Sequence, residues 1–100
     1  MLGIVSNEAS VLLDPETNHP HIYRHEVTEQ EVEDILAHPG EDRLGHEGSR
    51  VAIGQTRTGR YLRVIYVQDK ELNSIFVITA YDLLGKTLIA YRRRMRRRKK

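Results

Sequence analysis

The sequence predicts a small α+β domain in which an acidic helix precedes a short antiparallel sheet and a basic helix follows it. Three observations predict this class: a helix-start signature at residues 28–32, apolar-alternating strands on either side of a Thr-Gly turn, and an arginine-rich C-terminal segment. The chain has 100 residues, of which 39% are hydrophobic and 30% are charged. That length and composition suit a single domain, residues 1–100, built around one core.

The acidic helix is predicted over residues 29–38. Thr28 followed three residues later by Glu31 is a capping box, in which each side chain accepts a hydrogen bond from the backbone N–H of the other residue. Val27 and Val32 occupy the two positions of a hydrophobic staple. The acidic side chains lie mostly in the first turns, where the helix dipole favours negative charge. A His-Pro-Gly sequence ends the helix.

The sheet is predicted to follow this helix. Residues 41–49 are polar and contain glycines, which predicts a loop. Residues 50–56 and 60–68 alternate between apolar and polar side chains on either side of the Thr-Gly turn, which predicts a hairpin. Residues 74–81 are apolar on both faces, which predicts a central strand that is covered on both sides. With a short opening strand at residues 10–13, the antiparallel sheet would have three or four strands.

The last predicted element is a helix over residues 85–98. Apolar side chains recur along it at the spacing of a narrow stripe that docks on a sheet, namely Leu84, Leu88, Tyr91 and Met95. Residues 92–100 hold eight of the sixteen basic side chains and no acidic one. The other 91 residues carry eight basic and fourteen acidic side chains, a net charge of −6. The sequence therefore predicts an acidic body with a basic end, and such an end indicates an anionic partner.

Composition narrows the function classes further. The chain has no cysteine, which excludes disulfides and thiolate metal sites. It contains no apolar run near the roughly 18 residues needed to span a bilayer, and residues 1–5 lack the features of a secretion signal. We therefore expect a cytoplasmic protein with no membrane partner. His19, His21 and His25 invite a metal site, but no well-spaced carboxylate completes one, so neither a metal nor a small-molecule cofactor is expected.

Three segments carry a resemblance to a known family. Residues 24–35 (RHEVTEQEVEDI) are similar to the KHGVSxxEVxxVL opening of the BrnT toxins and of a related uncharacterised family. Residues 51–66 (VAIGQTRTGRYLRVIY) are similar to the AIGxTxxGRxLxVVY hairpin, and residues 77–81 (VITAY) are similar to the strand that follows it. Where BrnT toxins have two arginines around that strand, this chain has Phe76 and Tyr81.

The chain thus resembles BrnT toxins over roughly residues 20–95. The resemblance implies the RelE-like fold, in which a twisted antiparallel sheet carries helices. It also implies the toxin of a type II toxin–antitoxin pair, a metal-independent endoribonuclease whose partners are RNA and a cognate antitoxin protein. The alternative is a non-catalytic module of the same fold that binds nucleic acid or a protein partner.

A ribonuclease without a metal must activate the ribose 2′-OH, protonate the leaving oxygen and stabilise charge on phosphorus. His25 is the candidate acid or base, Arg63 the candidate phosphate ligand, and Tyr81 a hydroxyl donor or stacking platform. Each has a structural alternative. His25 can pack or cap the helix, and Arg63 can instead pair with an acid of the predicted helix 29–38. A further tyrosine, Tyr91, is predicted to lie in the core.

The basic side chains have several interpretations. Arginines at the ends and turn of the predicted hairpin form a possible phosphate rim, and those of the last helix form a basic arm. The predicted RNA-binding residues are Arg24, Arg50, Arg57, Arg60, Arg92, Arg93, Arg94 and Arg96. The basic arm binds RNA by phosphate neutralisation, binds an acidic protein such as an antitoxin, folds against the acidic helix, or is simply solvated. The four alternatives stay open at this level.

Overall fold

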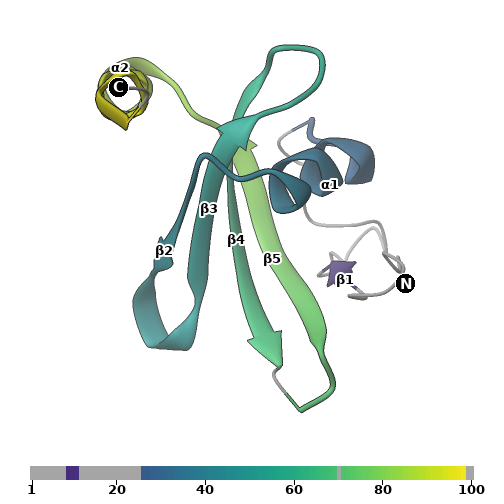
Figure 1. Cartoon of the computed structure of the whole chain (residues 1–100). Coiled ribbons are helices and arrows are strands. Elements are labelled where there is room, and N and C mark those ends of the chain that lie inside the picture. Colours follow the sequence, from purple (N-terminus) through teal and green to yellow (C-terminus); the bar gives the residue numbers. More distant parts are fainter. Residues whose placement is uncertain (1–8, 12–25, 70, 99–100) are drawn as a thin grey trace.

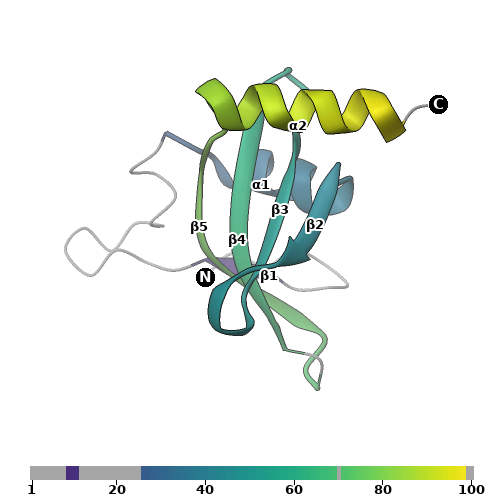
Figure 2. The same ribbon diagram turned by 90° about the vertical axis from the view of Figure 1, so that its left-hand side faces the viewer.

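A computed structural model describes residues 9–11, 26–69 and 71–98 of the chain. A sheet lies between two helices that cover its opposite faces (Figures 1 and 2). In chain order, the elements are β1 (Ala9–Val11), α1 (Glu29–Ala37), β2 (Glu41–Leu44), the 3₁₀ turn η2 (His46–Gly48), β3 (Arg50–Gln55), β4 (Tyr61–Asp69), β5 (Ser74–Asp82) and α2 (Gly85–Arg98). The predicted α+β class is confirmed. No helix in this described part is long and apolar enough to cross a membrane.

The sheet has the strand order β1-β5-β4-β3-β2. Strands β2 to β5 pair antiparallel with their neighbours, as predicted for the meander, and β1 pairs parallel with β5. The prediction of a loop over residues 41–49 is wrong, since its first four residues form the edge strand β2. Three of those four side chains are exposed, so the strand lacks the apolar alternation that would reveal it.

The predicted central position of residues 74–81 is correct only in that β5 is not an edge strand. The central strand is β4, and β5 lies between β4 and the three-residue strand β1. The two faces of β5 are not equally covered, because Val77 is fully buried whereas Phe76 is 36% exposed. The predicted opening strand at residues 10–13 overlaps β1, and its last two residues lie outside the described part of the chain.

Helix α1 begins with the predicted capping box. The Thr28 side chain accepts from the backbone N–H of Glu31, and the Glu31 carboxylate accepts from the Thr28 N–H at 2.9 Å. The helix packs an aliphatic face on β3, β4 and β5, in a core that includes Val27, Val32, Ile35, Ala52, Leu62, Val64 and Val77. All seven of these residues are at most 1% exposed.

Helix α2 covers the other face. Side chains alternate along β4, so that Leu62 and Val64 point toward α1 whereas Tyr61 and Ile65 point toward α2. Figure 2 shows α2 lying across one end of the strands rather than along them. The predicted docking stripe is correct for Leu88, Tyr91 and Met95 and wrong for its first member, Leu84, which is 67% exposed. Leu84 lies in the linker before the helix, outside the contact.

Candidate nucleic-acid interface

Helix α2 is attached to the sheet mainly through one tyrosine. Tyr91 is 4% exposed, which confirms its predicted place in the core, and its ring meets the Tyr61 ring edge to face with centroids 6.1 Å apart. The Tyr91 hydroxyl lies so close to Gly40 that a Cβ at that position would overlap it. Burial raises the pKa of Tyr91, so the hydroxyl keeps its proton. Gly40, just before β2, thus leaves the space in which Tyr91 of α2 packs.

An ion pair between the half-buried Arg94 and the buried Glu41 holds the same helix to the edge strand. Arg94 donates two hydrogen bonds to the Glu41 carboxylate, with Nη2 2.9 Å from Oε1. Glu41 is 6% exposed, and the hydrogen bond from Arg94 holds the pKa of its carboxyl below the ordinary value. Arg98 lies 3.7 Å from the same carboxylate and donates to the Gly40 carbonyl at 3.0 Å. Part of the basic arm therefore pairs within the molecule, with β2 and not with the predicted acidic helix.

The other arginines of α2 have no carboxylate partner among the described residues. Arg92 lies over the Tyr61 ring, with its guanidinium carbon 5.9 Å from the ring centroid. Arg93, Arg96 and Arg97 are exposed. Beside them is a hollow of about 270 Å³ lined by Gln55, Tyr61, Tyr91, Arg92, Met95 and Arg96. The hollow combines cations with aromatic rings, the two features on which single-stranded nucleic acids bind.

Two of the predicted catalytic residues are neighbours on this same face. Arg63 of β4 pairs directly with Tyr81 of β5, and both belong to a row of four residues across the sheet that includes Ile53 and Glu41. The Arg63 Nε atom is buried and has no hydrogen-bond partner among the described residues. Arg63 cannot pair with an acid of α1, because α1 lies on the opposite face of the sheet. That alternative for Arg63 is therefore wrong.

Arg60 is committed to ion pairs on the α1 side. Its Nε lies 2.6 Å from Asp82 and its Nη1 lies 3.0 Å from Glu31, and the same Nη1 donates to the Glu26 carbonyl at 2.7 Å. The hydrogen bond to Asp82 and the charge of Glu31 raise the pKa of Arg60 despite partial burial. Arg60 thus ties the entry of α1 to the end of β5.

The predicted phosphate rim of Arg50, Arg57 and Arg60 does not assemble. Arg50 starts β3 and pairs with Tyr66, at the far end of the hairpin from the turn that carries Arg57 and Arg60. Its Nε lies 3.0 Å from Asp42, which raises the pKa of Arg50. Arg57 is 85% exposed and lies 3.5 Å from Asp34. Residues at the two ends of paired strands are separated by the strand length, about 3.3 Å per residue.

The Asp42 carboxylate that receives Arg50 also accepts from the Tyr66 hydroxyl at 2.6 Å. Burial, reinforced by Asp42, raises the pKa of Tyr66 to about 12. This network lies on the α1 face, away from α2. This network is structural, because Arg50 and Tyr66 both donate their hydrogen bonds to Asp42.

Arg24 and His25 lie outside the described residues, as do His19 and His21. Within the described ranges, no group of three or more His, Asp or Glu side chains is placed to hold a metal ion. Two contributors to the interface escaped the sequence prediction, Glu41 and Tyr61. A single acidic residue in a polar segment, such as Glu41, gives no sequence signal that it is buried. Tyr61 fits the alternation of an ordinary strand, so nothing in the sequence marks it as part of a binding surface.

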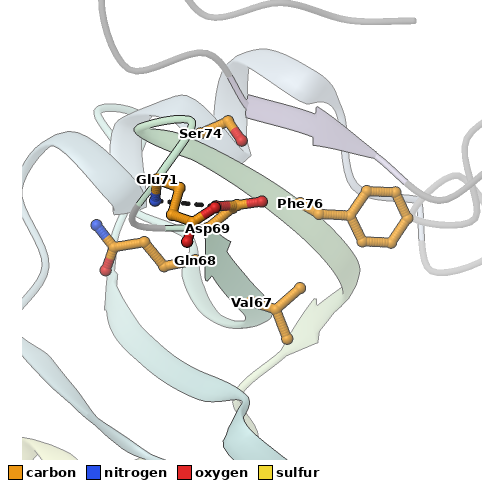
Figure 3. Close-up of a pocket in the computed structure, with 6 residues that line it drawn as sticks. All are labelled: Val67, Gln68, Asp69, Glu71, Ser74 and Phe76. Carbon is orange, nitrogen blue, oxygen red and sulfur yellow. Dashed lines mark hydrogen bonds between the residues drawn. The ribbon is translucent and has the colours of Figure 1, made fainter.

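A second hollow, of about 530 Å³, lies at the β4–β5 turn (Figure 3). Acidic and polar side chains line it together with Val67 and Phe76, and the Asp69 carboxylate accepts from the backbone N–H of Glu71 at 3.0 Å. Its carboxylates would repel an anion. It does not extend the basic surface of α2.

Scans of this chain against protein-family models, curated protein sequences and solved structures find no significant match in any of the three.

Proposed function

We propose that this protein binds RNA through α2 and the sheet face beside it, as a BrnT-like domain. The observation that carries the proposal is the division of charge on α2. Arg94 and Arg98 lie against Glu41, whereas Arg93, Arg96 and Arg97 have no carboxylate partner among the described residues. Two arginines attach the helix and the others remain available to phosphates, so the binding surface is held in place by its own anchor.

The chemistry of the surface suits single-stranded RNA. Guanidinium groups bind phosphates and release condensed counterions, which provides affinity independent of sequence. Bases that leave the stack pack on aromatic rings and on guanidinium planes. The hollow beside α2 offers both, with Tyr61 beneath Arg92 and with Arg96 at its edge.

The test measures the affinity of a fluorescent single-stranded RNA by anisotropy across a range of salt concentrations. Replacing Arg93, Arg96 and Arg97 together by Gln removes up to three phosphate contacts, and should lower the slope of log affinity against log salt by about two. Arg57→Gln is the single-charge control, because Arg57 is exposed at the β3–β4 turn. Equal affinities and slopes for the triple variant and the wild type would refute the proposal.

A second candidate function is metal-independent RNA cleavage. It is favoured by the direct pairing of Arg63 with Tyr81, because the two side chains then start from adjacent positions on the α2 side of the sheet. In this scheme, Arg63 stabilises charge on phosphorus, Tyr81 donates a proton, and His25 acts as acid or base. Cleavage would make the protein a toxin-like endoribonuclease, whereas binding alone would make it an interaction module.

Expression in a bacterium separates these two functions. We expect growth arrest by the wild type, relieved by His25→Ala and weakened by Tyr81→Phe, which keeps the ring and removes the hydroxyl. Purified wild type should cleave RNA in the presence of a chelator. Harmless expression of the wild type, with intact RNA binding in vitro, would exclude cleavage and leave the binding function standing.

A further inference from the structure

A cavity of about 400 Å³ lies on the α2 side of the sheet, where β2 and the loop after it meet β3 and β4. Its polar lining comes from Arg43, His46, Ser49 and Arg63, and its apolar walls include Val51 and Ile65. None of the described residues that line it is acidic. A cavity with two guanidinium groups, an imidazole and no carboxylate is suited to an anion.

The loop that carries His46 is closed by its own hydrogen bonds. The Gly45 N–H donates to the Ser49 carbonyl at 2.8 Å, and the Ser49 N–H donates to the His46 carbonyl at 3.0 Å. The Ser49 hydroxyl donates to that same carbonyl at 2.7 Å. A Cβ at Gly45 would lie 2.7 Å from the Ser49 hydroxyl oxygen, so glycine is needed for this closure. The loop therefore holds the His46 backbone at the cavity rim.

Arg63 provides the second, independent observation. Its Nε is buried and lacks a hydrogen-bond partner among the described residues. A partly buried guanidinium without an acceptor for its Nε is costly, and because Arg63 lines the cavity, an anion there would balance its charge. The carboxylate in the same row of the sheet, Glu41, is already engaged by Arg94. Arg43, two residues further along β2 and on the same face, is exposed and adds a second positive charge.

We propose that this cavity binds a phosphate group, with Arg63 and Arg43 on its oxygens and the His46 imidazole at its rim. The cavity has room for more than the phosphate, so a sugar or base attached to it can lie against Val51 and Ile65. The phosphate belongs to an RNA strand or to a small phosphorylated metabolite such as a nucleotide. Only the first source rests on the proposed function, because phosphate recognition itself needs no RNA.

The experiment follows backbone amide signals of the ¹⁵N-labelled full chain during titration with inorganic phosphate and with a nucleoside monophosphate. Signals of Gly45 and Ser49 should shift, and Arg43→Gln or His46→Gln should weaken that response roughly tenfold, as expected for loss of a hydrogen bond to a charged ligand. Both replaced side chains are exposed, so the fold should be kept, which an unchanged unfolding midpoint verifies. Arg57→Gln controls for net charge.

The outcomes distinguish the source of the phosphate. If Arg43→Gln also weakens binding of the single-stranded RNA beyond the effect of Arg57→Gln, the phosphate is part of the RNA backbone. If only the nucleotide response is lost, the ligand is a small phosphorylated molecule. If phosphate binds but the wild type binds no RNA, the proposed function fails and the cavity stands. If no signal near the cavity shifts, or Arg43→Gln behaves as Arg57→Gln does, the phosphate site is refuted.

Discussion

The two faces of this sheet treat arginine in opposite ways. On the α1 side, Arg60 and Arg50 each lie against carboxylates, Asp82 and Asp42 among them. On the α2 side, Arg63 has a buried Nε without a hydrogen-bond partner among the described residues. Four arginines of α2, namely Arg92, Arg93, Arg96 and Arg97, likewise have no carboxylate partner among the described residues. Arg50 and Arg60 thus cross-link the α1 side, whereas on the α2 side only Arg94 and Arg98 are paired with a carboxylate, that of Glu41.

The two helices also differ in how completely they bury side chains against the sheet. Helix α1 buries Val32 and Ile35 to 1% and 0% exposure, whereas α2 buries fully only Tyr91 and reaches the sheet through half-buried Leu88 and Met95. Burial of aliphatic side chains provides most of the stability of a small domain. The α1 face therefore provides most of the stability, and the α2 face carries the proposed binding surface.

The largest expected effect tests that assignment directly. Ile35→Ala removes a fully buried side chain beneath α1 and should lower the free energy of unfolding by about 3 kcal/mol. Leu88→Ala, on the half-buried contact of α2, should cost about 1 kcal/mol. Urea unfolding of both variants measures the difference. Equal losses of unfolding free energy would mean that the two faces contribute equally to stability.

The next effect concerns the paired arginines. Arg60→Gln removes the cation between Asp82 and Glu31 and leaves two carboxylates in a half-buried setting, so we expect a loss of about 2 kcal/mol. Arg57→Gln removes an exposed arginine near Asp34 and should change stability by less than about 0.5 kcal/mol. Thermal unfolding of the two variants gives the comparison. A stable Arg60→Gln protein would show that this network is not structural.

A smaller effect is expected where α2 is seated. Gly40→Ala places a methyl group against the Tyr91 hydroxyl and should displace the helix, at a cost of about 1.5 kcal/mol. Gly54→Ala is the matched control, because its nearest neighbours, Gly40 N and Ile35 Cδ1, lie 3.4 Å from the added carbon. Amide spectra should show changes along α2 in the first variant alone. Unchanged α2 signals in Gly40→Ala would show that the contact between Gly40 and Tyr91 does not position the helix.

The sequence predicted the local elements well and the assembly of the site less well. The capping box of α1 and the paired strands β3 and β4 depend on patterns within a few residues, so they could be predicted. The strand β2 could not, because exposed edge residues need no alternation. The same limit hid Glu41, whose burial depends on Arg94, 53 residues away in the sequence.

The arginines also show that local sequence does not reveal which charged side chains pair in the fold. Arg50, Arg57 and Arg60 are close in sequence, yet the hairpin carries Arg50 to its far end. Arg60 has carboxylate partners 29 and 22 residues away, and no local pattern announces them. Charge alone therefore predicted an anionic partner, while the division between paired and available cations required the fold.

The smallest predicted effect is the pH dependence of α2 docking. The hydrogen bond from Arg94 lowers the pKa of Glu41 below its ordinary value of 4.5. The unfolded chain therefore takes up this proton at a higher pH than the folded chain does. The contribution to stability is complete above pH 4.5 and is lost as the pH falls through the lowered value.

Tyr91 and Met95 side-chain signals, recorded from neutral to acidic pH, should follow that loss in the wild type. Glu41→Gln should abolish this pH response, whereas the exposed Glu47→Gln should preserve it. An identical acid response in Glu41→Gln and in the wild type would mean that another carboxylate holds the helix, and the anchor assigned to Arg94 would fall with it.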